Sequence, residues 1–346
     1  MTNLNSSPVE RSQGFFSSAK GFMQQRMSVA LCTYNGALYL QEQLDSLRAQ
    51  TRLPDEMVIC DDGSKDGTIQ ILQDFSKRAP FPVCLSINDK NLGVAKNYEK
   101  AISLCSGEII ALCDQDDIWK EKKLEKIMNI FLTHSEEGLV FSDGEVVDEK
   151  GRPLNFRLWE AVNFCSRSQR AVSDGNSFAV FLKRNVVTGA ALAFRSQYKN
   201  LILPIPQDWV HDGWIALLIG AVSHLKFIQD PLIKYRQHSK NKIGIKEETF
   251  FNQWRQASVT RNDVYRLSAQ RYQKVKERLK IWNPEAIKPE ILAILDEKIA
   301  HLIVRAGLPD SRLKGIPYVL EELAKGHYHR YSNSWRSASK DLFLRR

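Results

Sequence analysis

Long apolar runs and closely spaced cysteines are missing from this 346-residue sequence. A helix that crosses a bilayer needs about 20 consecutive apolar residues. No run of 18 or more is present, so the sequence predicts no transmembrane helix. The six cysteines include no CxxC pair, and most of them lie within apolar runs. This pattern disfavours a cysteine zinc site or a disulfide framework and predicts reduced, buried thiols in the cytoplasm.

Glycine-rich phosphate loops are also missing. Neither GxxxxGK[ST] nor GxGxxG occurs, so the sequence predicts neither a P-loop nor a dinucleotide-binding turn. If the protein binds a phosphorylated ligand, a metal ion and scattered basic side chains must neutralise the phosphate charge.

Positive charge is in excess, and much of it lies near the C-terminus. The formal net charge is +9, and residues 247–346 contain 19 Lys and Arg against 12 Asp and Glu. The same stretch contains Phe250, Phe251, Trp254, Trp282 and Trp335. Basic helices with aromatic anchors are typical of proteins that rest on anionic membranes. A helical subdomain that buries these rings against the rest of the chain explains the composition equally well.

Short apolar runs alternate with amphipathic segments in the first 142 residues. The apolar runs predict strands at residues 27–33, 57–60, 82–87, 109–113 and 139–142. Apolar residues at helical spacing predict helices around residues 40–47, 98–105 and 124–131. Strands that alternate with helices pair in parallel through right-handed crossovers. We therefore predict an α/β fold with a mostly parallel central sheet and a C-terminal helical extension.

The remaining sequence suggests three regions. A strand is predicted at residues 186–194 and a helix at 209–221. Beyond residue 247 the pattern predicts helices, with breaks near 282–284, 307–309 and 315–317. The predicted organisation is a flexible polar leader at 1–26, an α/β domain at 27–246 and a basic helical region at 247–346.

Polar clusters follow three of the predicted parallel strands. Residues 33–35 follow the first strand, Asp61 and Asp62 follow the second, and residues 114–117 follow the fourth. Ligands of open α/β sheets bind beyond the carboxyl ends of the strands. We therefore predict one binding site where these three clusters meet.

The third cluster contains the carboxylates of Asp114, Asp116 and Asp117. Carboxylates this close together repel one another unless a cation lies among them. Hard oxygen ligands suit Mg²⁺ or Mn²⁺, which also bind substrate phosphates. In the alternative interpretation, Asp116 or Asp117 caps a helix that starts near Ile118. Likewise, the aspartates that follow the second strand either bind a nucleobase or ribose, or simply form a turn.

Seven short motifs occur in a characteristic order. VALCTYNG, CDDGSKDGT, NLGVAKN and DQDD lie at residues 29–36, 60–68, 91–97 and 114–117. Together they resemble the family 2 inverting glycosyltransferases of GT-A fold. VTGAALAFR, HDGW and YRQH, at residues 187–195, 211–214 and 235–238, are similar to the rhamnosyltransferase-like branch of that family. The resemblance extends from residue 27 to about residue 241 and implies a nucleotide-sugar donor and Mg²⁺ or Mn²⁺.

The resemblance also implies roles for individual residues. Asp212 would be the general base, and Asp116 and His238 would bind the metal. The residues implied in donor binding are Thr33, Tyr34, Asn35, Asp61, Asp62, Asn91, Lys96, Asp114, Gln115 and Arg236. The residues implied on the acceptor side are Thr188, Gly189 and Trp214. Lys96 departs from the pattern, because many members have Arg at or beside this position.

Plainer interpretations of some of these residues stay open. Asp212 lies near the start of a predicted helix, where a carboxylate often acts as a cap. Trp159, Trp209 and Trp214 either stack on a sugar ring or pack in the core. Asp143 follows the predicted strand at residues 139–142 and approaches the acceptor if that strand ends at the site.

The resemblance therefore implies an inverting glycosyltransferase that uses dTDP-rhamnose or a UDP-hexose. Its acceptor would be a hydroxyl of a surface polysaccharide or a lipid-linked glycan precursor, at the inner face of the cytoplasmic membrane. A sugar-phosphate nucleotidylyltransferase is an alternative, but such enzymes usually have a glycine-rich basic loop after the first strand. A third candidate is an inactive scaffold that binds a partner through its basic tail, although carboxylates are present at each expected position. No nucleic-acid-binding module is recognisable, so nucleic acid is not predicted as a partner.

Overall fold

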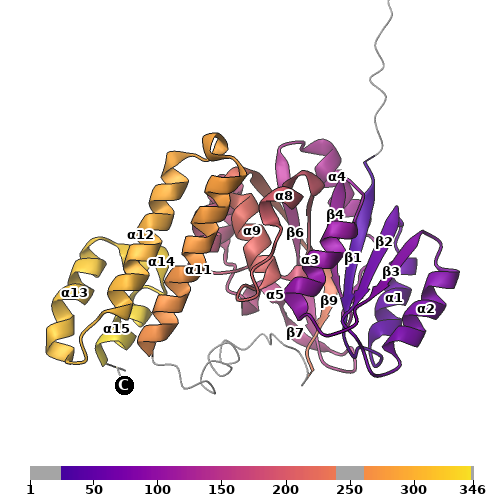
Figure 1. Ribbon diagram of the computed structural model, residues 1–346, viewed down its shortest axis with the longest axis horizontal. Coiled ribbons are helices and arrows are strands. Elements are labelled where there is room, and N and C mark those ends of the chain that lie inside the picture. Colours follow the sequence, from indigo (N-terminus) through magenta and orange to yellow (C-terminus); the bar gives the residue numbers. More distant parts are fainter. Residues whose placement is uncertain (1–24, 239–260, 344–346) are drawn as a thin grey trace, which may run out of the picture.

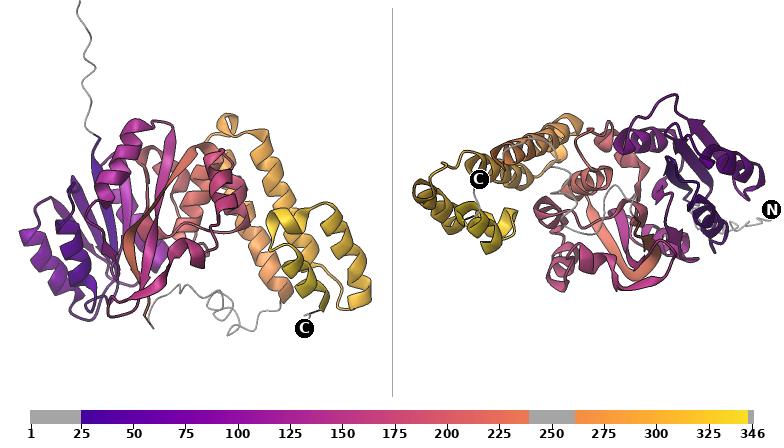
Figure 2. Two further views of the ribbon diagram at one scale, coloured as in Figure 1. Left: turned by 180° about the vertical axis from the view of Figure 1, so that it is seen from behind. Right: turned by 90° about the horizontal axis from the view of Figure 1, so that it is seen from below.

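The computed structural model describes residues 25–238 and 261–343 (Figure 1). Several predicted features lie outside these residues: nearly all of the leader at 1–26, the domain boundary at 246/247, and the aromatic residues Phe250, Phe251 and Trp254. Within the described ranges, helices pack around a twisted sheet, and a group of C-terminal helices lies to one side (Figures 1 and 2). None of the described helices is both long and apolar enough to cross a membrane.

The first half of the sheet is parallel, as predicted. In spatial order its strands are β3 (Val83–Ile87), β2 (Glu56–Asp61), β1 (Met27–Thr33) and β4 (Ile109–Asp114). The helices between and after them are α1 (Leu40–Arg48), α2 (Thr68–Arg78), α3 (Val94–Leu104) and α4 (Lys123–Thr133). All residues of β1 are buried, which explains its continuous apolar run. This strand order places the carboxyl ends of β1, β2 and β4 side by side.

The second half of the sheet is mixed. β8 (Leu192–Arg195) runs antiparallel to both β4 and β6 (Glu137–Val147), while β9 (His224–Arg236) runs parallel to β6. The short strands β5 (Ile118–Trp119) and β7 (Pro153–Arg157) are antiparallel to β9 and β6. The prediction of a strand at 186–194 is wrong over its first part, because Gly189–Ala191 forms the 3-10 turn η1 before β8.

Five helices lie between β7 and β9. They are α5 (Leu158–Ala161), α6 (Ser166–Ser173), α7 (Ser177–Lys183), α8 (Lys199–Ile202) and α9 (His211–Val222). Ten of the twelve residues of α9 are buried, as expected for a helix that is apolar on every face. The first turn of α9, which contains Asp212, is therefore in a dry environment.

The cysteines are free thiols, as predicted. Cys32, Cys60, Cys105 and Cys113 are buried in or beside the sheet. Cys84 and Cys165 are exposed, so the prediction of burial holds for four of the six.

The described C-terminal residues are helical. α11 (Arg261–Trp282) and α12 (Pro289–Ala306) pack side by side, and α13 (Arg312–Ala324), α14 (His327–Tyr331) and α15 (Trp335–Phe343) follow (Figure 1). The predicted breaks at 282–284 and 307–309 are present. The predicted break at 315–317 is wrong, because Pro317 lies within α13. Proline removes a single backbone donor, and here the helix continues past that loss.

Apolar packing is extensive near the sheet and sparse at the C-terminal end. Val275, Leu279 and Leu295 belong to the main core, so α11 and α12 pack on the α/β part. The second apolar cluster is small and consists of Leu308, Val319, Tyr328 and Ala338. Buried polar side chains occupy much of the remaining space between these helices: Lys298, His301, Arg305, Glu322, Ser332 and Asp341.

Candidate active site

The three predicted polar clusters meet at one edge of the sheet. Cys32 of β1 is in register with Asp114 of β4, and Thr33 is in register with Asp61 of β2. The end of β9 joins them, because the backbone N–H of Arg236 donates to Asp117 Oδ1 at 3.0 Å. Four strand ends therefore form the site, of which three follow from the alternating sequence pattern.

Asp61 organises the loops that follow β1 and β2. Its Oδ2 accepts hydrogen bonds from Thr33 Oγ1 at 2.7 Å and Ser64 Oγ at 2.6 Å, and its Oδ1 accepts from the Ser64 backbone. Asn35 has a positive φ of 49° and bonds to Ser64 and Lys65. Both the turn predicted at Asp61 and its place at the site edge are therefore observed.

Asp62 fixes a third loop, at residues 88–93. Its Oδ1 accepts from Asn88 Nδ2 at 3.0 Å and Leu92 N at 2.7 Å, and its Oδ2 accepts from Gly93 N at 2.9 Å. Gly93 has a φ of +85°, which residues other than glycine rarely adopt. Asn91 also lies here, with Nδ2 3.5 Å from the Asp62 carbonyl. Asp62 therefore holds the loop from which α3 begins.

Lys96 and Gln115 have partners within the protein. Lys96 Nζ is 2.7 Å from Glu99 Oε2 on the same helix. Gln115 bonds to both the backbone N–H and the carbonyl of Tyr34, at 2.8 and 3.2 Å. The Tyr34 side chain is 40% exposed, so this pair presents an aromatic ring at the edge of the site.

The Asp114–Asp117 cluster concentrates negative charge. Burial, and then the charge of Asp116, raise the pKa of Asp114 to about 7. The same two causes raise the pKa of Asp117 well above its ordinary range. Asp117 Oδ2 is buried and makes no hydrogen bond with a described residue. The sequence leads into β5, not a helix, since α4 starts at Lys123, so the helix-cap interpretation of Asp116 and Asp117 is wrong.

Two residues that sequence analysis missed support this cluster from below. Tyr98 Oη donates to Asp114 Oδ1 at 2.5 Å. The Lys123 side chain is fully buried, donates to the Ala190 carbonyl and lies 3.5 Å from the centre of the Trp119 ring. Burial lowers the pKa of Lys123 to about 7, while Cys113 and the nearby aspartates oppose this shift. Lys123 sits in an otherwise apolar helix stripe, which is the signal that could have identified it.

Arg236 and His238 connect β9 to the acidic cluster. His238 Nε2 is 2.9 Å from Asp116 Oδ2, which brings the two predicted metal ligands together. Arg236 is 1% exposed, and its guanidinium donates to the carbonyls of Asp116 and Glu149 and to Glu42 Oε2. The contact with the Asp116 carbonyl holds the Asp116 backbone in place, a role that the sequence did not predict for Arg236.

Asp212 lies in the first turn of α9, but the N-cap of this helix is Val210, so the helix-cap interpretation of Asp212 is wrong. Its carboxylate reaches outside the helix, accepting from Asn185 Nδ2 at 2.8 Å and from Gly189 N at 3.1 Å. Burial raises the pKa of Asp212 to about 6. Thr188 precedes Gly189 at this contact, so two residues predicted on the acceptor side lie next to the predicted base.

A pair of stacked rings, Tyr98 and His211, lies between the Asp114–Asp117 cluster and the helix turn that contains Asp212. Tyr98, which bonds to Asp114, stacks on His211 with ring centres 4.0 Å apart. His211 precedes Asp212, and burial lowers the pKa of His211 to about 3, so this imidazole is neutral near pH 7. Asp114 and Asp212 therefore lie on either side of a neutral, packed pair of rings.

Trp159, Trp209 and Trp214 pack in the core. Trp214 is 1% exposed, and its indole N–H donates to the Ile202 carbonyl at 2.8 Å. The proposed sugar contact at Trp214 is therefore corrected, because its ring is covered on all sides. Trp159 is 7% exposed and packs edge-on against Phe164, and Trp209 packs against Trp214.

Asp143 lies within β6, and its hydrogen bonds and ion pair are with residues outside the Asp114–Asp117 cluster. It accepts hydrogen bonds from the backbones of Gly144 and Trp159 and lines a cavity of about 420 Å³ with Arg157 and Phe164. The prediction that β6 ends near Ser142 is wrong, because β6 continues to Val147 through a register shift.

Sequence comparison identifies related proteins. Residues 28–183 match the profile of the family described as glycosyl transferase family 2. An uncharacterized glycosyltransferase of Nostoc sp. is 27% identical over 220 residues, which are 62% of this chain and 66% of the relative. The chain spans 59 to 66% of the length of the first curated relatives that it matches.

Two solved structures are similar in fold. S. aureus TarS 1–349 in complex with UDP-GlcNAc has a TM-score of 0.53 at 17% identity, covering 92% of this chain and 81% of that one. The mannosyltransferase PcManGT from Pyrobaculum calidifontis, in complex with GDP-Man and Mn²⁺, has a TM-score of 0.54 at 18% identity, covering 93% and 86%. At these identities the likeness concerns the fold alone, which is the GT-A glycosyltransferase fold.

Gly189→Ala is expected to destabilise the protein. The new Cβ would lie 2.6 Å from His211 Nε2, and the stacked Tyr98 ring prevents the imidazole from moving away. Overpacking of this kind costs about 1–3 kcal/mol, so the urea midpoint followed by circular dichroism should fall. Gly67→Ala is the control, because its Cβ would meet Ala37 at an ordinary 3.7 Å. Equal midpoints for the two variants would contradict the close packing at Gly189.

Proposed function

We propose that this chain, whose residues 28–183 match glycosyl transferase family 2, is an inverting glycosyltransferase. It transfers a sugar from a nucleoside diphosphate to an acceptor hydroxyl. The principal support is the placement of Asp212, buried and oriented, across the Tyr98–His211 pair from the Asp114–Asp117 cluster. This arrangement separates a base for the acceptor from a charged site for the leaving group.

The donor is a nucleotide sugar whose base and ribose lie over the ends of β1 and β2. Thr33, Asn35 and Asp61 form a connected rim there, with the Tyr34 ring exposed beside it. TarS was solved with UDP-GlcNAc and PcManGT with GDP-Man, which supports a nucleotide-sugar donor. The rhamnosyltransferase-like motifs at residues 187–195, 211–214 and 235–238 favour dTDP-rhamnose or a UDP-hexose.

Asp116 and His238 are the residues that would hold Mg²⁺ or Mn²⁺. Two protein ligands leave room for diphosphate oxygens and water, which is the usual way in which these ions bind nucleotides. Asp117 Oδ2 is buried without a hydrogen bond from any described residue, and the pKa of Asp114 is raised; both features fit a site that binds a cation. When bound, such an ion supplies Lewis-acid neutralisation of the leaving diphosphate. The Mn²⁺ in PcManGT is consistent with this assignment.

Asp212 would take the proton of the acceptor hydroxyl. Three donors, from Asn185, Gly189 and Gly213, fix the carboxylate in one orientation. A fixed base on one side of the sugar and a leaving diphosphate on the other permit direct displacement with inversion. The acceptor is a hydroxyl of a surface polysaccharide or a lipid-linked glycan precursor, and Thr188 borders its approach.

A donor panel tests this function. The purified protein is incubated with nucleotide sugars, with and without Mn²⁺ or Mg²⁺, and nucleoside diphosphate release is measured. We expect metal-dependent release from one donor, and the product formed with a glycan acceptor should have an inverted anomeric configuration. Asp116→Ala and Asp212→Asn should each lower turnover by about 10²–10⁴-fold, the usual range for loss of a catalytic group.

Asp74→Asn is the matched control, because Asp74 is on the surface of α2 and bonds to Gln70 and Lys77. Its turnover should equal that of the unmodified protein. If Asp116→Ala stops release while Asp212→Asn does not, the assignment of the base is wrong and the metal assignment stands. A panel in which no donor binds or reacts would overturn the glycosyltransferase proposal.

The rate should depend on pH through Asp212. The base acts in its ionised form, and burial raises its pKa to about 6. We therefore expect kcat/KM to be constant above about pH 7 and to fall as pH decreases through 6. The neighbouring His211 stays neutral over this range, since its pKa is lowered to about 3.

Asn185→Ala should move this acidic limb to higher pH. Asn185 donates a hydrogen bond to Asp212, which favours the ionised carboxylate, so its loss raises the pKa of Asp212. Asn129→Ala on the surface of α4 is the control and should leave the profile unchanged. A limb that stays in place in Asn185→Ala would exclude Asp212 as the titrating base.

We also propose that the C-terminal helices rest on an anionic membrane. Leu313 and Leu320 of α13 are 80% and 56% exposed and lie seven residues apart, on one helix face. Trp335 of α15 is 65% exposed. Exposed apolar side chains combined with the basic excess of residues 247–346 match the composition of helices that lie in a membrane interface.

Co-sedimentation with vesicles tests the membrane contact. The protein should bind vesicles that contain phosphatidylglycerol and should bind much less to pure phosphatidylcholine, because each basic residue near the surface contributes about 1 kcal/mol. Leu313→Glu should weaken binding, whereas Leu132→Glu, a 45%-exposed leucine on α4, should not. Binding that is unchanged without anionic lipid would refute this proposal.

A further inference from the structure

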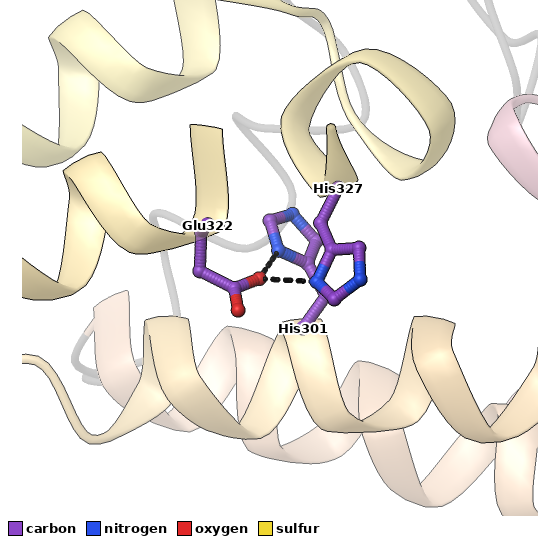
Figure 3. A group of neighbouring side chains, drawn as sticks. All are labelled: His301, Glu322 and His327. Atoms are coloured by element: carbon purple, nitrogen blue, oxygen red, sulfur yellow. Dashed lines mark hydrogen bonds and ion pairs between the residues drawn. The ribbon is translucent and has the colours of Figure 1, made fainter. Parts of the chain in front are cut away.

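Three metal-ligating side chains meet among the C-terminal helices (Figure 3). His301 comes from α12, Glu322 from α13 and His327 from α14. Glu322 Oε2 is 2.5 Å from His301 Nδ1 and 2.9 Å from His327 Nδ1. The three ligand atoms all lie within 4.8 Å of one another. Both imidazole rings therefore direct the same nitrogen toward one carboxylate oxygen.

The cluster is shielded from water. The exposed fractions of the His301, Glu322 and His327 side chains are 0, 5 and 12%. Two imidazole nitrogens and one carboxylate oxygen form a three-residue ligand set that Zn²⁺ uses in proteins together with a water molecule in the fourth position. Mg²⁺ and Ca²⁺ prefer sites built from oxygen alone. The donor atoms and their burial thus favour a borderline transition metal over a hard ion.

The outer nitrogens of both rings face oxygen atoms. His301 Nε2 is 3.0 Å from Ser332 Oγ, which also accepts from Arg305 Nη1 at 2.8 Å. His327 Nε2 is 4.0 Å from Glu297 Oε2. Ligand histidines usually have such a partner, which fixes the tautomer and orients the ring. When one metal ion binds both Nδ1 atoms, each neutral imidazole has its proton on Nε2. Two neutral rings therefore release no proton when the metal binds.

The position of the cluster gives a metal a structural role. The apolar cluster of α13, α14 and α15 is small, and small cores are commonly supplemented by metals. The three ligands come from three successive helices and span residues 301–327. One ion would therefore join α12, α13 and α14 directly. Glu322 and the nearby Glu297 would balance its charge.

We propose that His301, Glu322 and His327 form a structural site for a zinc-class dication that fixes the C-terminal helices. The site is separate from the sheet edge, because α13 and α14 lie on the far side of α11 from β1, β2 and β4 (Figure 1). It is independent of the proposed transferase activity. In the competing interpretation, the three side chains form a hydrogen-bond network without a metal, and that is the alternative outcome of the test.

Metal titration of the full chain tests the site. The Asp116→Ala chain is used so that the sheet-edge cluster does not contribute, and its exposed thiols are alkylated. After treatment with a chelator, it is titrated with Zn²⁺ by calorimetry and with Co²⁺ by visible absorption. We expect one equivalent of Zn²⁺, a Tm that rises with Zn²⁺ concentration, and Co²⁺ bands typical of nitrogen and oxygen ligation. Mg²⁺ should neither bind in the calorimeter nor raise the Tm.

His327→Gln should lose the Zn²⁺-dependent rise in Tm and the Co²⁺ bands. His329→Gln is the matched control on the same helix, because His329 is exposed and packs against Trp335, and it should bind as before. Glu322→Gln, which keeps the size of the side chain, provides a second variant if His327→Gln unfolds. Circular dichroism without metal shows that each variant is folded. Absence of stoichiometric Zn²⁺ binding, or equal binding by folded His327→Gln or Glu322→Gln, would overturn the proposal.

Discussion

Negative charge gathered at the carboxyl edge of an apolar sheet is the constraint on which the α/β part depends. A buried carboxylate is costly unless it is hydrogen-bonded or paired with a cation. Asp61 and Asp62 meet this requirement with hydrogen bonds from three neighbouring loops, including the backbone N–H groups of Ser64, Leu92 and Gly93. The same bonds fix the shape of these loops. The hydrogen bonds that compensate the charge of Asp61 and Asp62 are therefore also the bonds that fix the loops.

The negative charge at the end of β4, in Asp114, Asp116 and Asp117, is compensated less completely. Lys123 lies beneath it and Arg236 holds its backbone, yet the pKa of Asp114 remains raised and Asp117 Oδ2 has no hydrogen bond with a described residue. This remaining imbalance makes the edge suitable for a cation and a diphosphate. At the C-terminal end, buried polar groups again occupy positions where apolar side chains would suffice for packing. There, too, the arrangement favours a positive ion, held by Glu322 and two histidines.

Much of the fold could be predicted from local pattern. Continuous apolar runs predicted β1 to β4 within one or two residues, and leucines at helical spacing predicted α1, because burial on one or both faces imposes its own period on a sequence. The prediction failed where long-range pairing decided the structure. β8 is a short strand inserted antiparallel between β4 and β6, and no local feature encodes which strands it joins. Pro317 was expected to end a helix, but a single missing donor did not outweigh the packing of α13.

The sequence by itself indicated the resemblance to family 2 glycosyltransferases, the fold class and the acidic positions Asp114, Asp116 and Asp212, because these depend on residue type and order along the chain. Only the tertiary structure decided which side chains support them. Tyr98 belongs to an ordinary apolar stripe, and nothing local distinguishes it from a core residue until α3 packs against the end of β4. Lys123 stands out as a charged residue beside an apolar stripe, but only the packing of α4 decides that its ammonium group is buried against the Ala190 carbonyl and the Trp119 ring. Burial and pKa likewise depend on all neighbouring elements together. They are properties of the packed chain, because desolvation is set by contacts between residues far apart in sequence.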